Sequence, residues 1–175
     1  MSYFAAAVAR GPAGWTAAEL DLTGAADIEE VADRMRDASP DAELTLLFVE
    51  ADDLYLAILR LDQGEDLRIF GSDSVFAEES RLGALLLGDI ETPALEIDDV
   101  TEPPPLPADD DEVEPPATTP DIEPVGDADL LADVGVSSHQ LLELCGHEGM
   151  MPADVTAEVC QILGCGDEVE ELREA

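Results

Sequence analysis

Three cysteines and a histidine near the carboxyl end of the chain are the residues whose types best suit them to chemistry. Cys145, His147, Cys160 and Cys165 offer the thiolate and imidazole ligands that zinc prefers. Neither close pair has the common C-x₂-C spacing, and Cys160 falls on the apolar face of a predicted helix. Cysteine is a frequent small residue of hydrophobic cores. We therefore favour core thiols, and a zinc site built from these four residues remains the alternative.

The histidines and glycines give no further sign of a reaction centre. His139 and His147 are the only histidines, and no serine, cysteine or aspartate stands beside them in the manner of a nucleophile and its base. Gly164, Cys165 and Gly166 precede acidic residues, which would repel a phosphate group. We therefore expect no enzyme activity and no catalytic, cofactor-binding or metal-binding residue.

The charge of the chain restricts its partners more than any motif does. Its 175 residues include 43 acidic and 7 basic ones, a formal net charge of −36, and every basic residue is an arginine. Affinity for nucleic acid depends on cations that displace counterions from phosphates, and binding to anionic lipid has the same requirement. The composition therefore excludes direct binding to nucleic acid or to anionic membranes, and it favours a basic protein as the partner.

Cysteine number and the amino terminus indicate where the protein works. An odd count of three cysteines is typical of a reducing compartment. The first residues carry no cationic segment before a short apolar stretch, and no apolar run approaches the length of a membrane span. We expect a cytoplasmic protein without a membrane segment.

Proline and charge divide the chain into three parts, residues 1–90, 91–126 and 127–175. Nine of the 12 prolines lie between Pro93 and Pro124, and residues 91–129 hold 14 acidic residues and no basic one. Such a segment cannot bury enough apolar surface to offset the entropy of ordering, so residues 91–126 are predicted to form a disordered acidic linker. Its densest run is Asp109, Asp110, Asp111 and Glu112. This run is either a docking site for a basic surface or a solvated spacer.

Residues 1–90 show the pattern of an α+β domain in the order ββαβββα. The expected antiparallel sheet has about five strands with helices packed on it, and a strand around Leu56 is apolar on both faces, as in a covered central strand. Asp27 begins a helix as a capping residue, and Ser72 or Ser74 caps a second helix that ends at Gly88. The predicted strands span residues 3–10, 15–22, 44–50, 54–61 and 66–71.

Residues 127–175 are predicted to form a small helical region. Ser137 and Gln140 suit a capping box, and Pro152 suits the first turn of a helix that Gly164 ends. This region has no aromatic residue and is marginal as a separate unit, so we expect it to need a surface on which to dock.

Several runs of the two ordered parts resemble one bacterial family. These runs are YFAAAVAR at 3–10, GWTAAELDL at 14–22, EESRLGALLLGD at 78–89, PADVTAEVC at 152–160 and GCGDEVEEL at 164–172. They are similar to the tRNA adenosine deaminase-associated proteins, and the similarity leaves out the linker. The resemblance implies association with the enzyme that converts adenosine to inosine in tRNA. It carries over no catalytic or binding residue.

The chain itself lacks the motifs of that deaminase. Zinc nucleobase deaminases need H-x-E and P-C-x-x-C. Here His147 is followed by Glu148 and Gly149, and four residues separate Cys160 from Cys165, with no proline before the first. We therefore predict a non-catalytic acidic accessory protein whose partner is basic, with a tRNA adenosine deaminase as the candidate. The alternatives are the zinc-dependent site and a general binder of basic proteins.

Overall fold

A six-stranded antiparallel sheet forms the centre of the molecule, in the order β2-β1-β3-β4-β5-β6. The computed structural model describes residues 3–88, 124–146 and 150–174. The strands are β1 (Tyr3–Gly11), β2 (Gly14–Glu19), β3 (Leu44–Ala51), β4 (Tyr55–Asp62), β5 (Asp66–Gly71) and β6 (Val125–Gly126). The prediction of an α+β fold with an antiparallel sheet is confirmed. The sixth strand comes from the end of the segment predicted as linker, and it pairs with Phe70 and Gly71.

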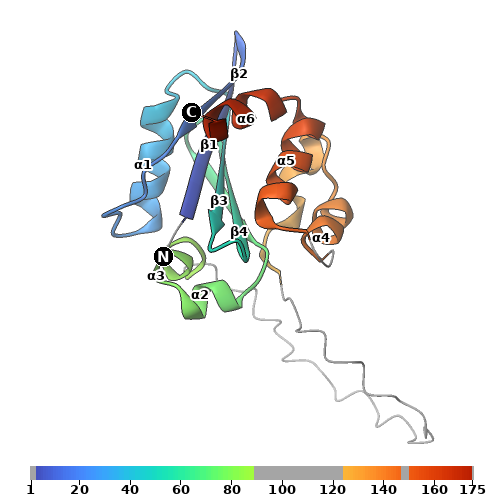
Figure 1. Cartoon of the computed structure of the whole chain (residues 1–175). Coiled ribbons are helices and arrows are strands. Elements are labelled where there is room, and N and C mark those ends of the chain that lie inside the picture. Colours follow the sequence, from blue (N-terminus) through green and yellow to red (C-terminus); the bar gives the residue numbers. More distant parts are fainter. Residues whose placement is uncertain (1–2, 89–123, 147–149, 175) are drawn as a thin grey trace, which may run out of the picture.

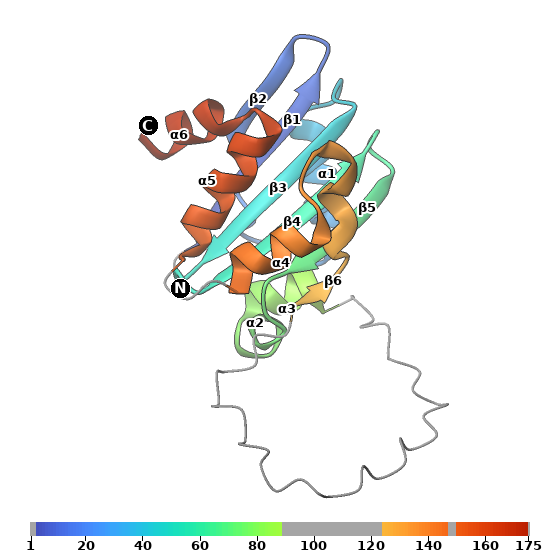
Figure 2. The same ribbon diagram turned by 90° about the vertical axis from the view of Figure 1, so that its right-hand side faces the viewer.

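Helices cover both faces of this sheet, as Figure 1 shows. On the first face lie α1 (Ile28–Ala38), α2 (Val75–Glu79) and α3 (Arg81–Leu87). On the second face lie the 3-10 helix η2 (Ala128–Val134), α4 (Ser138–Gly146), α5 (Pro152–Leu163) and α6 (Gly166–Glu174). Figure 2, which faces the second side, shows α4 and α5 in front of the strands. The helical region of residues 127–175 therefore packs on the second face of the sheet, as expected for a region too small to be stable alone.

Alternate residues of the central strands supply the two halves of the core. Leu47 and Val49 of β3 point to the first face, whereas Leu46 and Phe48 point to the second. All eight residues of β3 are buried, and residues 56–61 of β4 are buried as well. Side chains in a strand alternate between its faces, so a strand that is apolar throughout needs cover on both sides. The expectation of a covered central strand at Leu56 is confirmed.

The helix beginnings follow the predicted capping residues in part. Asp27 caps α1, since its Oδ1 accepts the main-chain N–H of Glu30 at 2.9 Å. Glu30 in turn reaches the N–H of Ala26, one residue before the cap, at 3.0 Å. Ser137 Oγ accepts the N–H of Gln140 at 3.2 Å, and the left-handed Gly164 ends α5 as predicted.

The helix predicted to start at Ser72 or Ser74 is instead two helices. Ser80 interrupts it and caps α3, because its Oγ accepts the N–H of Gly83 at 3.3 Å. Ser74 makes no capping hydrogen bond, and the Ser72 hydroxyl is buried against the N–H of Leu56. The break lets Gly83 lie against α2, where a Cβ would stand 1.9 Å from the carbonyl oxygen of Phe76. Only glycine fits at this approach.

Candidate interaction site

The cysteines of the candidate zinc site lie in and beside the core of the second face. Cys160 and Cys165 are completely buried, and Cys165 hydrogen bonds to Cys160, which together with burial raises the pKa of Cys160. Burial also raises the pKa of the half-buried Cys145 to about 12. Thiols with raised pKa values stay protonated at neutral pH, and protonated thiols are poor nucleophiles and poor metal ligands. Burial thus disfavours the thiolate form of Cys145 and Cys160.

The structure brings together only part of the predicted zinc set. Cys160 and Cys165 are neighbours, and His147 lies outside the described residues. Within residues 3–88, 124–146 and 150–174, no three His, Cys, Asp or Glu side chains gather as a metal site would require. His139 is exposed on α4. The acidic run Asp109, Asp110, Asp111 and Glu112 also lies outside the described residues.

Most arginines are held by acidic residues of the same chain. Within the part of the chain that the structure describes, five of the seven form ion pairs and Arg10 and Arg81 form none. The pairs are Arg34–Glu30 (2.8 Å), Arg36–Asp33, Arg60–Asp62 (2.9 Å), Arg60–Asp133, Arg68–Asp127 (3.9 Å) and Arg173–Glu50. The few positive charges are thus largely neutralised from within, and carboxylates dominate the outward charge.

Arg60 is the most deeply placed of these cations. It lies in β4 among the apolar residues of the second face, with 7% of its side chain exposed. Its guanidinium donates to both carboxylate oxygens of Asp62, to both of Asp133 and to the carbonyl oxygen of Leu130. The hydrogen bond from Arg60 lowers the pKa of Asp133. This cluster fastens η2 to the sheet.

Arg173, the one basic residue of α6, points toward the sheet. Its guanidinium pairs with Glu50, whose side chain is 8% exposed, and lies 4.8 Å from the centre of the Phe4 ring. The other charged residues of α6 are acidic: Asp167, Glu168, Glu170, Glu171 and Glu174. Beside Arg173 and Glu50, a cavity of about 430 Å³ is lined by three further carboxylates, those of Glu19, Asp52 and Asp53. This end of the molecule is therefore rich in acidic residues.

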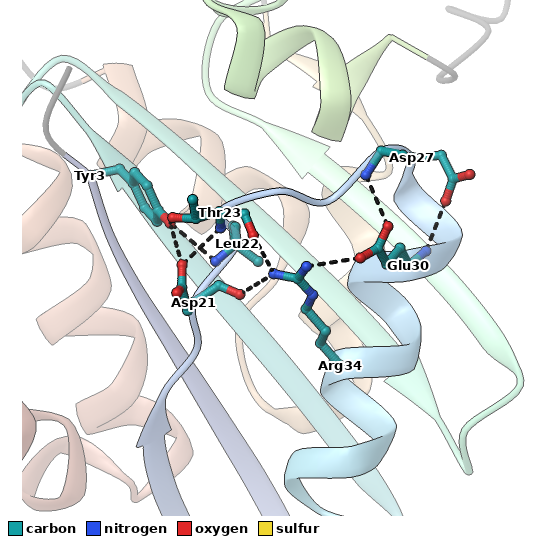
Figure 3. Close-up of polar contacts among 8 residues, drawn as sticks. Tyr3, Asp21, Leu22, Thr23, Asp27, Glu30 and Arg34 are labelled. Atoms are coloured by element: carbon teal, nitrogen blue, oxygen red, sulfur yellow. Dashed lines mark hydrogen bonds and ion pairs between the residues drawn. The ribbon is translucent and has the colours of Figure 1, made fainter.

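A hydrogen-bonded network fixes the loop between β2 and α1 (Figure 3). The Tyr3 hydroxyl accepts the N–H of Leu22 at 3.1 Å and donates to Asp21 at 3.2 Å. Arg34 donates to the carbonyl oxygens of Asp21 and Thr23. Hydrogen bonds from Thr23 lower the pKa of Asp21, and those from the main chain of Ala26 and from Arg34 lower the pKa of Glu30. The carboxylates of Asp21 and Glu30 thus form hydrogen bonds that stabilise this loop.

The arrangement of ion pairs could not be read from the sequence. Arg60 and Asp133 are 73 residues apart, and Arg173 and Glu50 are 123 apart. The available signal was the position of Arg60 and Glu50 within otherwise apolar strands, since a charge at such a position needs a partner. That signal marks the need for a partner and does not identify it.

Fold and site together define an acidic α+β protein, with a sheet covered on both faces and its cations largely paired within the chain. The chain belongs to the family of Rv3753c-like tRNA adenosine deaminase-associated proteins, whose model matches residues 3–166. The match runs from β1 to the first residue of α6, so it includes both helical layers. The resemblance seen in the sequence is confirmed.

The family name implies association with tRNA adenosine deaminase. Comparisons with curated proteins and with solved structures find no match. In the described residues, no helix combines the length and the apolar character needed to cross a membrane.

Proposed function

We propose that this chain is a non-catalytic accessory protein whose acidic surface binds the basic, tRNA-gripping surface of a tRNA adenosine deaminase. The observation that carries the proposal is the imbalance of charge: 43 acidic residues face 7 arginines, and five of those arginines are already paired within the described chain. An enzyme that holds tRNA presents cations to phosphates. A strongly negative protein is drawn to the same cations.

The state of the thiols supports a role without catalysis. The pKa of Cys145 is raised to about 12 by burial, and hydrogen bonding and burial also raise the pKa of Cys160. A nucleophilic or metal-binding cysteine needs the opposite shift, toward the thiolate. The ion pairs of Arg60 with Asp133 and of Arg173 with Glu50 join helices to strands, which is a structural use of charge.

The proposed contact makes the accessory protein a competitor of tRNA. Both ligands are polyanions, so they would occupy the same basic surface of the deaminase. If the complex instead leaves the tRNA site open, the accessory protein acts as a tether or stabiliser. Adding tRNA to the preformed complex separates these two modes, since a competitor is displaced and a tether is retained.

The direct test is co-purification of the full chain with the tRNA adenosine deaminase of the same organism at about 50 mM NaCl, where surface charges are weakly screened. The proposal predicts a complex in gel filtration. Absence of the complex at this salt concentration would overturn it. A panel of unrelated basic proteins serves as the control, because equal binding to all of them would show a general acidic binder.

The acidic run of the predicted linker can be tested within the same experiment. One variant carries Asp109→Asn, Asp110→Asn, Asp111→Asn and Glu112→Gln. A matched variant removes four charges from α6 through Asp167→Asn, Glu168→Gln, Glu170→Gln and Glu171→Gln. A docking site at the run predicts that the first variant binds the deaminase more weakly than the second, whereas a spacer predicts no such excess.

A further inference from the structure

A groove on the first face lacks the acidic side chains that line two other cavities of the described structure. It has a volume of about 690 Å³ and lies between the loop of residues 22–26 and α3. Of the described residues that line it, none is acidic, and Arg81 is the one with a charged side chain. In a chain with 43 acidic residues this composition sets the site apart, and the acidic cavity beside Arg173 shows the contrast. We call this site the Arg81 groove.

Apolar side chains form most of the wall of the Arg81 groove. Leu22 and Leu82 belong to the core of the first face, and Tyr3 and Leu85 pack against that core while remaining half-buried. Ala84 lies on the same helix and is exposed. The volume is in the range of sites that enclose a ligand or several side chains of a partner. The groove is therefore an apolar depression continuous with the core.

The loop side of the groove is preformed. Tyr3 holds the N–H of Leu22, and Arg34 holds the carbonyl oxygens of Asp21 and Thr23 (Figure 3). The acidic side chains next to the groove, Asp21 and Glu30, are turned to these contacts. A wall that is already ordered costs little conformational entropy when a partner binds, which favours affinity.

Arg81 is a cation without an ion pair among the described residues. It is exposed at the first residue of α3, so its guanidinium is free to donate to an incoming group. A guanidinium is best matched by a carboxylate, which accepts two parallel hydrogen bonds. The chemistry of the groove thus fits an apolar segment that also carries one carboxylate.

Interface physics indicates why a partner would use this site. Long-range attraction brings a basic protein to an acidic one, but the buried centre of an interface is depleted of charge and contains apolar anchors. Burying an unpaired carboxylate is costly, so an acid-lined surface is a poor place for such an anchor. The Arg81 groove offers apolar burial without that cost. A second copy of this chain is a poor occupant, because both copies carry −36.

We propose that the Arg81 groove is the anchor site for the protein partner: apolar side chains of the deaminase fill it, and a carboxylate of the same segment pairs with Arg81. This inference rests on the proposed function and adds the location of the contact. Attraction by the overall charge and burial in the groove are separate contributions, so variants can separate them.

The test measures the dissociation constant of the full chain with the deaminase for two matched pairs of variants. Arg81→Gln is compared with Arg10→Gln, because Arg10 also lacks an ion pair among the described residues and both changes remove one positive charge. Ala84→Glu is compared with Ala132→Glu, because Ala132 is exposed on η2 at the opposite face. Circular dichroism and melting temperatures check that all four variants fold.

The signs of the effects decide the outcome. Overall charge alone predicts that loss of either arginine tightens binding slightly, and equally. The groove predicts that Arg81→Gln weakens binding by about three- to tenfold, and Ala84→Glu by at least about tenfold, while both controls bind like the wild type or tighter. Equal effects within each pair overturn the groove and leave the proposed function intact. No wild-type complex overturns both, and a dimer that Ala84→Glu dissociates would show that a second copy occupies the groove.

Discussion

The two faces of the sheet are built in different ways. The first face joins α1, α2 and α3 to the strands through an apolar core, and α3 lies close to α2 where Gly83 faces the carbonyl oxygen of Phe76. The second face also has an apolar core, but it includes two ion pairs, each with one buried member: Arg60 pairs with the exposed Asp133, and Glu50 pairs with the partly exposed Arg173.

This difference relates to how far each set of helices lies along the sequence from the strands that it covers. The first face is covered by helices near in sequence to the strands they pack on. The second face is covered by helices that come after residues 89–123. A buried charge left without a partner costs free energy, so the buried Arg60 and Glu50 disfavour any arrangement that separates η2 or α6 from its strand. The ion pairs thus specify the position of the carboxyl-terminal helices.

Removing Arg60 is expected to give the largest loss of stability. Arg60→Met keeps the aliphatic bulk but leaves Asp133, Asp62 and the Leu130 carbonyl without their donor. We expect the free energy of unfolding to fall by about 3 kcal/mol, at the low end for buried pairs because Asp133 is itself 61% exposed. Urea unfolding measures the loss. Arg68→Met is the control, since its 3.9 Å pair with Asp127 is exposed and should change stability by less than about 0.5 kcal/mol.

The outline of the fold follows from local patterns in the sequence. Strands β3 and β4 are apolar at successive positions, which indicated cover on both faces before any helix was placed. Pro152 and Gly164 marked the ends of α5, because proline suits a first turn and glycine a left-handed end. These features depend on neighbouring residues, so the sequence displays them directly.

Features that depend on contacts between separate elements were missed. Strand β6 has two residues and exists through its pairing with β5, and no periodicity marks so short an element. The break at Ser80 is stabilised by the fit of Gly83 against Phe76, which lies seven residues earlier. The Arg81 groove also joins Tyr3, the loop of residues 22–26 and α3, which come together only in the folded chain. The sequence showed that the chain is acidic and that its cations are few. The position of the Arg81 groove depends on the folded structure.

On the first face, the change that corresponds to Arg60→Met on the second face is Gly83→Ala. The added Cβ would meet the Phe76 carbonyl oxygen at 1.9 Å, so α2 and α3 must move apart. We expect a loss of about 2 kcal/mol in the free energy of unfolding, as for other overpacked sites. Gly11→Ala is the control, because a Cβ at that residue would have no atom within 4 Å and its backbone is not left-handed. Equal losses for the two variants would show that the helix contact is loose.

The contribution of Asp133 to the free energy of unfolding is expected to depend on pH. Arg60 lowers the pKa of Asp133 below the value in the unfolded chain, so the contribution is fully present above the unfolded pKa and is lost as the pH falls through the folded pKa. The difference in stability between the wild type and Asp133→Asn should therefore shrink from neutral to strongly acidic pH. Chemical denaturation at a series of pH values measures it. A difference that stays constant would rule out this ion pair as the cause.

Metal removal is expected to have the smallest effect. Cys160 is buried with a raised pKa, so we expect the fold to be independent of zinc. Treatment with EDTA should leave the melting temperature unchanged, and elemental analysis should find far less than one zinc per chain. Stoichiometric zinc that disappears in Cys160→Ala would restore the zinc site of Cys145, His147, Cys160 and Cys165 and would make the second face metal-dependent.

The salt dependence of the complex with tRNA adenosine deaminase tests the central claim most directly. Fluorescence anisotropy of the labelled full chain gives the dissociation constant between about 50 and 300 mM NaCl. Binding through the carboxylates of a −36 protein predicts an affinity that falls by at least about tenfold over this range. An affinity that is unchanged by salt would contradict the account.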